Sequence, residues 1–373
     1  MNKLAILHFS PIEQYPPVLN LLNFLAAKEN SGFQVRVITM KPGSGFPAFK
    51  SPADHIRIIR RGGSNKKGLA AYLSYLTYYA GALLQLITWR PDTILYYETI
   101  SCFPALIFKK YLGRRSSLFI HYHEYASENE YRQGTLLNRW GHRLEKNMYH
   151  LVKGISHTNE DRIRLFREDL AGFSLPPIHA FPNYPPVSWR PDGRQPTDIG
   201  LPVRLVYVGA LSLDTMYTRE LVDWVMKQDG KVIWDIYSDN MTDEARAFLG
   251  ALKSDWVHFR KGVNYYVLPQ ILAGYDIGII LYKGHIQNYV HNAPNKLFEY
   301  LACGLDVWFP DVMLGCHPFV TRGVYPKVMA VDFQDLAGWQ LGPAIDHTGL
   351  QNRPSEFYAE HVLPKMLHEL ETP

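Results

Sequence analysis

Cysteine is scarce in this sequence, and its three copies are not spaced like a disulfide framework or a zinc site. Cys102, Cys303 and Cys316 are odd in number, and no C-x-x-C pair occurs. This composition favours a reducing compartment. The segment Met1–Phe9 has neither the long apolar core nor the small-residue cleavage site of a signal peptide and instead predicts a first strand. We therefore expect a cytoplasmic protein.

Low-complexity tracts and repeats of solenoid length are also lacking, which argues against a disordered chain or a coiled coil. Apolar residues make up 47% and charged residues 20% of the chain, as in an ordinary globular enzyme. Because 373 residues exceed the usual span of one hydrophobic core, we expect two domains.

The net charge is only +4, but the basic residues gather in the first third of the chain. Residues 1–115 contain 15 Lys and Arg against 5 Asp and Glu, a balance of +10, so the remainder carries −6. The clusters are Arg57, Arg60, Arg61, Lys66 and Lys67, and then Lys109, Lys110, Arg114 and Arg115. Each basic residue contributes about 1 kcal/mol near anionic lipid headgroups. A solvated face with no partner is the alternative.

Strands and helices alternate through the first half. Short apolar runs predict strands at 3–9, 34–39, 56–59, 93–97 and 117–122, and helical spacing predicts helices at 18–27, 68–89 and 103–111. This alternation predicts an α/β fold with a mainly parallel sheet covered on both faces.

The stretch Gly68–Trp89 has no charged residue over its 22 positions, whereas a membrane span needs about 20 mostly apolar residues. Tyrosine and hydroxyl side chains interrupt it, and an Arg-Pro-Asp turn follows at once. We predict a buried or interfacial helix, which could still rest against a bilayer surface.

A proline-rich stretch at 181–186 and a polar run at 190–200 predict a linker. Beyond it, strands are expected at 203–209, 232–237, 256–259 and 276–281, with helices between them. The second half thus restarts the same alternation.

The most informative segment predicts a short helix between two buried strands, at Asn292–Gly304. Pro294 suits the first helical position, Asn292 can cap the helix, and Gly304 can end it in the left-handed conformation. The free N–H groups at the helix start, together with Lys296, would attract a diphosphate. Glu299 can accept hydrogen bonds from vicinal hydroxyls such as those of a ribose. A surface ion pair between Lys296 and Glu299 is the alternative.

The run P-N-K-L-F-E-Y-L-A-C-G-L-D-V at 294–307 resembles the donor-binding signature of family 4 glycosyltransferases, the group 1 glycosyl transferases. Residues 205–211 are similar to the strand and turn that open the family's second domain, and residues 181–183 lie where its members cross between domains. The resemblance implies a GT-B fold, with two Rossmann-like α/β domains facing each other across a cleft.

The resemblance also implies which domain binds which substrate. An acceptor-side domain is expected at 1–185 and a nucleotide-sugar donor domain at 200–350. A C-terminal helix at 355–373 is expected to pack back on the first domain. The family uses no cofactor and needs no metal ion, because basic residues and helix ends neutralise the leaving diphosphate.

Within the donor domain, the resemblance implies that Glu299 holds the ribose and that Lys296 lies near the phosphates. Further donor-binding positions are Gly209, Asn292, Asn295 and Leu297. The family often carries a glutamate eight residues before the ribose-binding one, and His291 stands there as a catalytic candidate. Ala210, Leu211 and Ser212 occupy a turn in which the family usually has arginine, so Arg219 is the candidate substitute.

In the first domain, His121-Tyr122-His123-Glu124 ends a predicted strand, where α/β sheets present residues to a cleft. By resemblance His123 would touch the transferred sugar. A metal site and a merely structural histidine pair are the alternative interpretations of this segment. Residues 11–16 replace the family's Gly-Gly loop, which places Glu13 and Tyr15 on the acceptor side. Glu13 or Glu124 would be the base if the reaction inverts.

The sequence therefore predicts a metal-independent, retaining hexosyltransferase. It would move a sugar from a nucleotide-diphosphate sugar to a glycan or lipid-linked acceptor in surface polysaccharide synthesis. We expect it in the cytoplasm, with peripheral contact to the inner face of an anionic membrane as an open possibility, and no nucleic-acid partner. A nucleotide-sugar epimerase of the same fold and a non-catalytic glycan-binding module are the alternatives.

Overall fold

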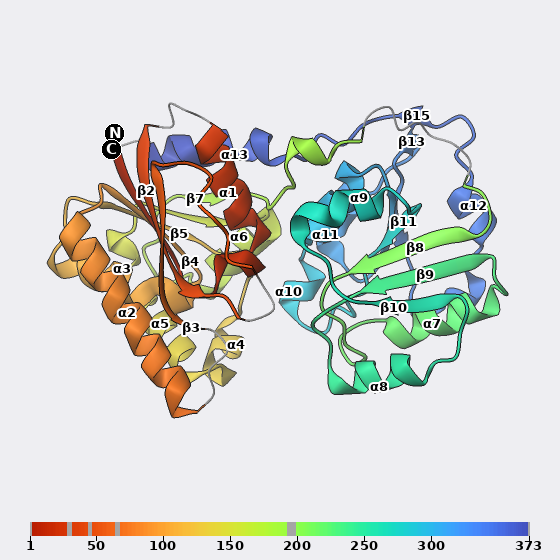
Figure 1. The fold of residues 1–373 in the computed structure, drawn as a ribbon, viewed down its shortest axis with the longest axis horizontal. Coiled ribbons are helices and arrows are strands. Elements are labelled where there is room, and N and C mark those ends of the chain that lie inside the picture. Colours follow the sequence, from red (N-terminus) through yellow and green to blue (C-terminus); the bar gives the residue numbers. More distant parts are fainter. Residues whose placement is uncertain (1, 28–31, 44–46, 64–67, 192–198, 372–373) are drawn as a thin grey trace. The chain divides into compact units, whose positions relative to one another are not determined.

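The computed structural model describes residues 2–27, 32–43, 47–63, 68–191 and 199–371. The chain divides into two compact units (Figure 1). The first contains Met1–Asn183 together with Ala359–Pro373, and the second contains Tyr184–Tyr358. The second unit is therefore an insertion between two segments of the first.

The first unit is built on a seven-stranded parallel sheet in the order β3-β2-β1-β4-β5-β6-β7. Because the order reverses between β1 and β4, their carboxyl ends form the switch point at which open α/β sheets bind ligands. The strands are β1 Asn2–His8, β2 Phe33–Lys41, β3 Ile56–Gly63, β4 Thr93–Tyr97, β5 Ser117–His121, β6 Gly154–His157 and β7 Ile178–Ala180.

Helices α2 and α3 pack against one sheet face through one large apolar cluster, and α5 adds Leu144 to it. The C-terminal helix α13 packs beside α1, and Thr93 Oγ1 donates a hydrogen bond to the Leu370 carbonyl at 3.2 Å. The helices are α1 Pro16–Ala27, α2 Leu69–Trp89, α3 Cys102–Tyr111, α4 Glu128–Gln133, α5 Leu136–Lys146, α6 Glu160–Asp169 and α13 Ala359–Glu371. Short 3-10 turns are η1 Ile12–Gln14, η2 Thr99–Ser101 and η3 Tyr149–Leu151.

Helix α2 is buried along one side only. Tyr78, Ala82 and Leu86 recur every four residues and face the sheet, so the opposite side meets solvent. Within the described ranges, no helix combines the length and the apolar character needed to cross a membrane. Lys66 and Lys67, part of the first predicted basic cluster, lie outside the described residues.

The second unit repeats the plan with a six-stranded parallel sheet in the order β10-β9-β8-β11-β12-β14. Its strands are β8 Val203–Val208, β9 Val232–Tyr237, β10 Val257–Arg260, β11 Ile277–Ile279, β12 Asp306–Pro310 and β14 Val328–Val331. A two-stranded sheet joins β13 Val324–Tyr325 to β15 Gln351–Asn352. The predicted α/β class with parallel sheets is confirmed.

Helices of the second unit connect and cover these strands. They are α7 Thr218–Lys227, α8 Asp243–Ala251, α9 Leu268–Leu272, α10 Gln287–Val290, α11 Asn295–Ala302 and α12 Leu341–Ile345. The 3-10 turns are η4 Val187–Trp189, η5 Tyr265–Val267, η6 Leu314–Phe319 and η7 Leu336–Gly338.

Candidate functional site

Helix α11 lies between β11 and β12 along the chain, as predicted, but it begins one residue later. Pro294 is the N-cap with extended angles (φ −69°, ψ 153°), so the predicted Pro294 start is wrong and Asn292 is not the cap. No side chain caps the helix start in this described segment. Gly304 has φ +73° and ends the helix in the left-handed conformation, as predicted. The first-turn N–H groups are thus left without a side-chain cap.

The position of α11 is fixed by Tyr300. Its ring lies against Gly278 of β11, where an added Cβ would come within 2.2 Å of the ring. Its hydroxyl accepts a hydrogen bond from the backbone N–H of Val208 at 3.2 Å. Leu297, predicted to contact the donor, belongs to the apolar core and is wholly buried. Its N–H donates to the Pro294 carbonyl at 2.9 Å, and its contact with the donor stays a prediction.

Gly209 and Lys296 lie next to each other although 87 positions separate them in the sequence. Gly209 has φ +138°, a conformation that side-chain-bearing residues rarely adopt. A Cβ added there would lie 2.6 Å from Cε and 2.7 Å from Nζ of Lys296. The Lys296 Nζ is also 6.0 Å from the centre of the Tyr207 ring. The Lys296 ammonium of α11 therefore lies beside the carboxyl end of β8.

The charges of Lys296 and Glu299 influence each other's pKa, but the two side chains do not form a close ion pair. No ion pair within 4.0 Å joins these two described residues, so the predicted surface-pair alternative is not what the structure contains. Burial lowers the pKa of Lys296, and the Glu299 carboxylate opposes that shift. Burial also raises the pKa of Glu299, with Lys296 opposing it. Glu299 is only 7% exposed, and its charged form gains from a polar ligand.

The turn before α11 is held by the segment after β12. An added Cβ on Gly315 would lie 2.5 Å from the carbonyl group of His291, so these backbones are in close contact. The Cys316 thiol donates to the Asn292 carbonyl at 3.4 Å. His291 ends α10, and its N–H donates to the Gln287 carbonyl at 3.0 Å. Asn295 is the first residue of α11. His291 and Asn292 thus lie in the turn before the N-cap Pro294, and Asn295 lies directly after it.

Arg219 belongs to helix α7. It is exposed on α7, and its guanidinium lies 4.6 Å from the centre of the Phe248 ring of α8. This is a cation–π contact, and the part of Arg219 in donor binding stays a prediction.

A second group of polar residues gathers in the first unit at the carboxyl ends of β1, β4 and β5. The His123 ring stacks on Tyr97 with centroids 4.9 Å apart, and it lies 6.0 Å from the His8 ring. Tyr15 packs against both histidines, at 4.3 Å from His8 and 5.6 Å from His123. Glu124 is exposed beside them.

Hydrogen bonds fix the tautomers of two of these histidines. The Asn183 amide donates to His123 Nδ1 at 3.3 Å, so the proton of neutral His123 is on Nε2. His8 Nδ1 donates to the Ser10 carbonyl at 2.7 Å, which leaves Nε2 as an acceptor. Both Nε2 atoms are buried and bond to no described residue. Burial lowers the pKa of His8 to about 4 and that of His123 well below its usual value, so both are neutral.

Glu98 is a residue that the sequence did not single out. It follows β4 with φ +61°, a strained conformation for a glutamate, and its carboxylate accepts the His123 N–H at 2.6 Å. Burial and the nearby Glu124 carboxylate raise the pKa of Glu98 to about 8. The Arg162 guanidinium holds the same loop by donating to the His123 carbonyl at 2.6 Å. Only the strand order brings these residues together.

Glu13, predicted as an acceptor-side base, already has partners. Its carboxylate pairs with Arg60 at 2.6 Å and accepts the Phe49 N–H at 2.9 Å. The side chain of Glu13 is 4% exposed, so it braces the loop after β1. In the described part of the chain, no cluster of three or more His, Cys, Asp or Glu residues is placed to hold a metal ion.

Solved structures similar to this chain are glycosyltransferases of the GT-B fold. Sucrose-phosphate synthase from Thermosynechococcus elongatus superposes with a TM-score of 0.68 at 14% identity, covering 98% of this chain and 97% of its own. Anabaena HepE, solved with UDP and glucose, gives 0.69 at 14% identity and covers 99% of both chains. A glycosyltransferase from Rickettsia africae gives 0.62 at 11% identity, with coverage of 100% and 99%.

No protein-family model and no curated protein sequence matches the chain. The structural likeness establishes the fold: two Rossmann-like units of the GT-B type, as the sequence predicted.

Proposed function

We propose that this protein is a glycosyltransferase that takes a hexosyl group from a nucleotide-diphosphate sugar. The observation that supports this most directly is the meeting of the α11 N-terminus, Lys296 and Gly209. The uncapped N–H groups and the ammonium attract a diphosphate, and the glycine leaves room for the Lys296 side chain beside them. HepE, which shares the fold, binds UDP and glucose, so UDP is the first nucleotide to test.

In this proposal each donor residue has one role. Lys296 binds the diphosphate and stabilises the charge that grows as it leaves, which replaces a metal ion. Glu299 accepts hydrogen bonds from the ribose hydroxyls. His291, Asn292 and Asn295 border the same ligand from the turn that enters the helix. Leu297 holds the helix in the core.

The first unit would bind the transferred sugar and the acceptor. His123 Nε2–H donates to a hydroxyl and His8 Nε2 accepts from one, which suits a polyhydroxylated ligand. Neutral histidines bind without adding charge. Tyr15 packs beside both rings. Glu124 is the exposed carboxylate at this site, and it would be the base in an inverting reaction, whereas we favour retention.

The acceptor would be a glycan or a lipid-linked saccharide in surface polysaccharide synthesis, and the enzyme would act in the cytoplasm. The excess of basic residues in the first 115 positions supports an anionic acceptor or membrane partner.

The test is a thermal-shift and calorimetric titration with UDP, other nucleoside diphosphates and their sugars. UDP or one of its relatives should raise the melting temperature of the wild type. Lys296→Ala should weaken binding about 10- to 150-fold, because a charge-assisted hydrogen bond contributes roughly 1.5–3 kcal/mol. Glu299→Gln should also weaken it. Lys253→Ala, an exposed lysine of the same unit, is the matched control and should bind normally.

Unchanged nucleotide binding in both Lys296→Ala and Glu299→Gln would contradict this donor site. Conversion of the donor sugar to an epimer without an acceptor would instead identify an epimerase. Nucleotide binding without turnover on any acceptor would identify a binding module.

A further inference from the structure

Helix α2 carries an apolar stripe on its solvent side. We define this stripe as Leu69, Tyr72, Leu73 and Leu76, whose spacing of three and four residues places them on one face. All four are exposed, Leu69 to 76% and Leu76 to 63%. Ala80, Leu84 and Ile87 continue the exposed face to the end of the helix. Contiguous apolar surface of this kind marks an interaction site.

Helix α5 presents a second exposed face that mixes apolar and cationic side chains. Leu136, Arg139, Trp140 and Arg143 share one side of the helix, and Trp140 is 60% exposed. The guanidinium groups of Arg139 and Arg143 form no hydrogen bond or ion pair with any described residue. A tryptophan in water beside two free arginines is typical of a helix that lies in a membrane interface.

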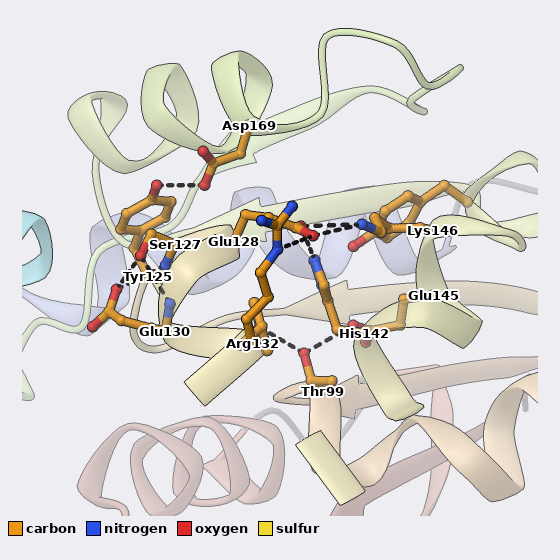
Figure 2. A network of polar contacts seen from close by, with 12 residues as sticks. Thr99, Tyr125, Ser127, Glu128, Glu130, Arg132, His142, Glu145, Lys146 and Asp169 are labelled. Atoms are coloured by element: carbon orange, nitrogen blue, oxygen red, sulfur yellow. Dashed lines mark hydrogen bonds and ion pairs between the residues drawn. The ribbon is translucent and has the colours of Figure 1, made fainter. Parts of the chain in front are cut away.

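A cationic pocket of about 260 Å³ adjoins that face, lined by Arg132, Arg139, Arg143 and Lys146 around Glu128. Figure 2 shows Glu128 between Arg132, His142 and Lys146, at 3.6, 2.8 and 3.0 Å. Burial lowers the pKa of His142, so it adds no charge at neutral pH. Four cations against one carboxylate leave the pocket with a charge of +3. It therefore attracts phosphate groups.

Helix α3 connects the two faces, because it packs against both α2 and α5. All three helices cover the same side of the sheet. The end of α3 exposes Tyr111 and Leu112, and exposed Arg114 and Arg115 follow. The outer surface of α2, α3 and α5 is thus apolar and aromatic with cations beside it.

We propose that this surface docks on an anionic phospholipid bilayer. The stripe and Trp140 would enter the headgroup region while the arginines of α5 bind lipid phosphates. A second copy of this chain is a poorer occupant, because facing copies would bring the unpaired arginines together. The inference rests on the proposed function and assigns its anionic membrane partner to one surface; loss of vesicle binding with intact UDP binding would count against this surface alone.

The test is flotation of the full chain with vesicles. One set contains phosphatidylcholine alone, and in the other phosphatidylglycerol replaces part of it. The protein should float with the anionic vesicles, remain unbound with the neutral ones, and be released by added salt, which screens the charges. Absence of flotation with the anionic vesicles at low salt overturns the proposal.

Three variants locate the surface. Arg139→Glu combined with Arg143→Glu should lower the partition coefficient at least about 10-fold, since each basic residue contributes about 1 kcal/mol near an anionic surface. Leu73→Ser with Leu76→Ser should also lower it. Lys365→Glu is the matched control, because it changes the charge as much as one arginine reversal but lies on α13. It should change binding by less than about twofold.

Equal losses per reversed charge in Lys365→Glu and the arginine variant would show that net charge alone drives binding. Unchanged binding in both helix variants would show that another surface binds. Either result overturns the assignment. All substituted residues are exposed, and an unchanged melting temperature confirms that each variant is folded. A vesicle-free dimer that Leu73→Ser with Leu76→Ser dissolves would assign the stripe to a second copy and also overturn the proposal.

Discussion

Substituting Gly209 by alanine tests whether the glycine matters because it makes room for Lys296. The new Cβ would lie 2.6 Å from Lys296 Cε, whereas ordinary contacts are about 1 Å longer. The flexible lysine can withdraw, so this overlap costs little stability but moves the ammonium away from the site proposed for the diphosphate. Alanine at φ +138° adds backbone strain of roughly 1–3 kcal/mol.

The expected outcome is a double-mutant cycle with strong coupling. Gly209→Ala should weaken UDP binding about 10-fold when Lys296 is present, part of the roughly 1.5–3 kcal/mol that its contact contributes. With Lys296→Ala as the background, the collision no longer exists, so Gly209→Ala should have no further effect on affinity. Calorimetric titration measures the four affinities, and urea unfolding measures the strain.

Gly323→Ala is the control for strain alone. Gly323 lies in the same unit with φ +67°, and nothing lies within 4 Å of its added Cβ. It should lose stability but keep its affinity for UDP. An equal loss of affinity from Gly209→Ala in both lysine backgrounds would refute the reasoning, because the glycine would then act on the ligand independently of Lys296.

Two further predictions concern buried carboxylates. The pKa of Glu98, about 8 when folded against an ordinary 4.5, is raised, so its stabilising effect is complete below pH 4.5 and is lost as pH rises through 8. Wild type should lose roughly 2.5 kcal/mol of unfolding free energy between pH 6 and pH 9 from this group. In urea unfolding, Glu98→Gln should reduce this dependence of the unfolding free energy on pH. The same pH dependence in wild type and variant would disprove the raised pKa of Glu98. Asp306 accepts from His347 Nε2 and the Lys327 N–H, each at 2.7 Å, so Asp306→Ala should cost roughly 2–4 kcal/mol by urea unfolding, against little change for an exposed aspartate.

The strands were predictable because their burial is continuous. The runs at 93–97 and 232–237 coincide with β4 and β9, whose apolar side chains are covered on both sheet faces as in other parallel sheets. The start of α11 was predicted one residue early, because the composition of the segment does not reveal that Pro294 adopts extended angles. The left-handed Gly304 was predictable, since few residues other than glycine adopt that conformation.

Only part of the candidate site could be predicted, because a sequence motif identifies residues but not the residues that pack against them in the fold. Lys296 and Glu299 belong to one helical turn, so their proximity follows from sequence spacing. Gly209 meets Lys296 only through the packing of α11 on β8. Glu98 reaches the loop of His123 because β4 pairs with β5, and pairing order is a tertiary property. The ion pair of Glu13, a predicted base, was not foreseen, because its partner Arg60 lies on another strand.

The C-terminal helix α13 has a consequence for how the chain reaches its final form on the ribosome. Synthesis delivers all of the segment 184–358 before residues 359–371 emerge. The unit encoded second can therefore close its own core while the unit encoded first still lacks the helix that covers α1. Although amino-terminal units usually fold first, the first unit here cannot complete its packing until the last helix has been synthesised.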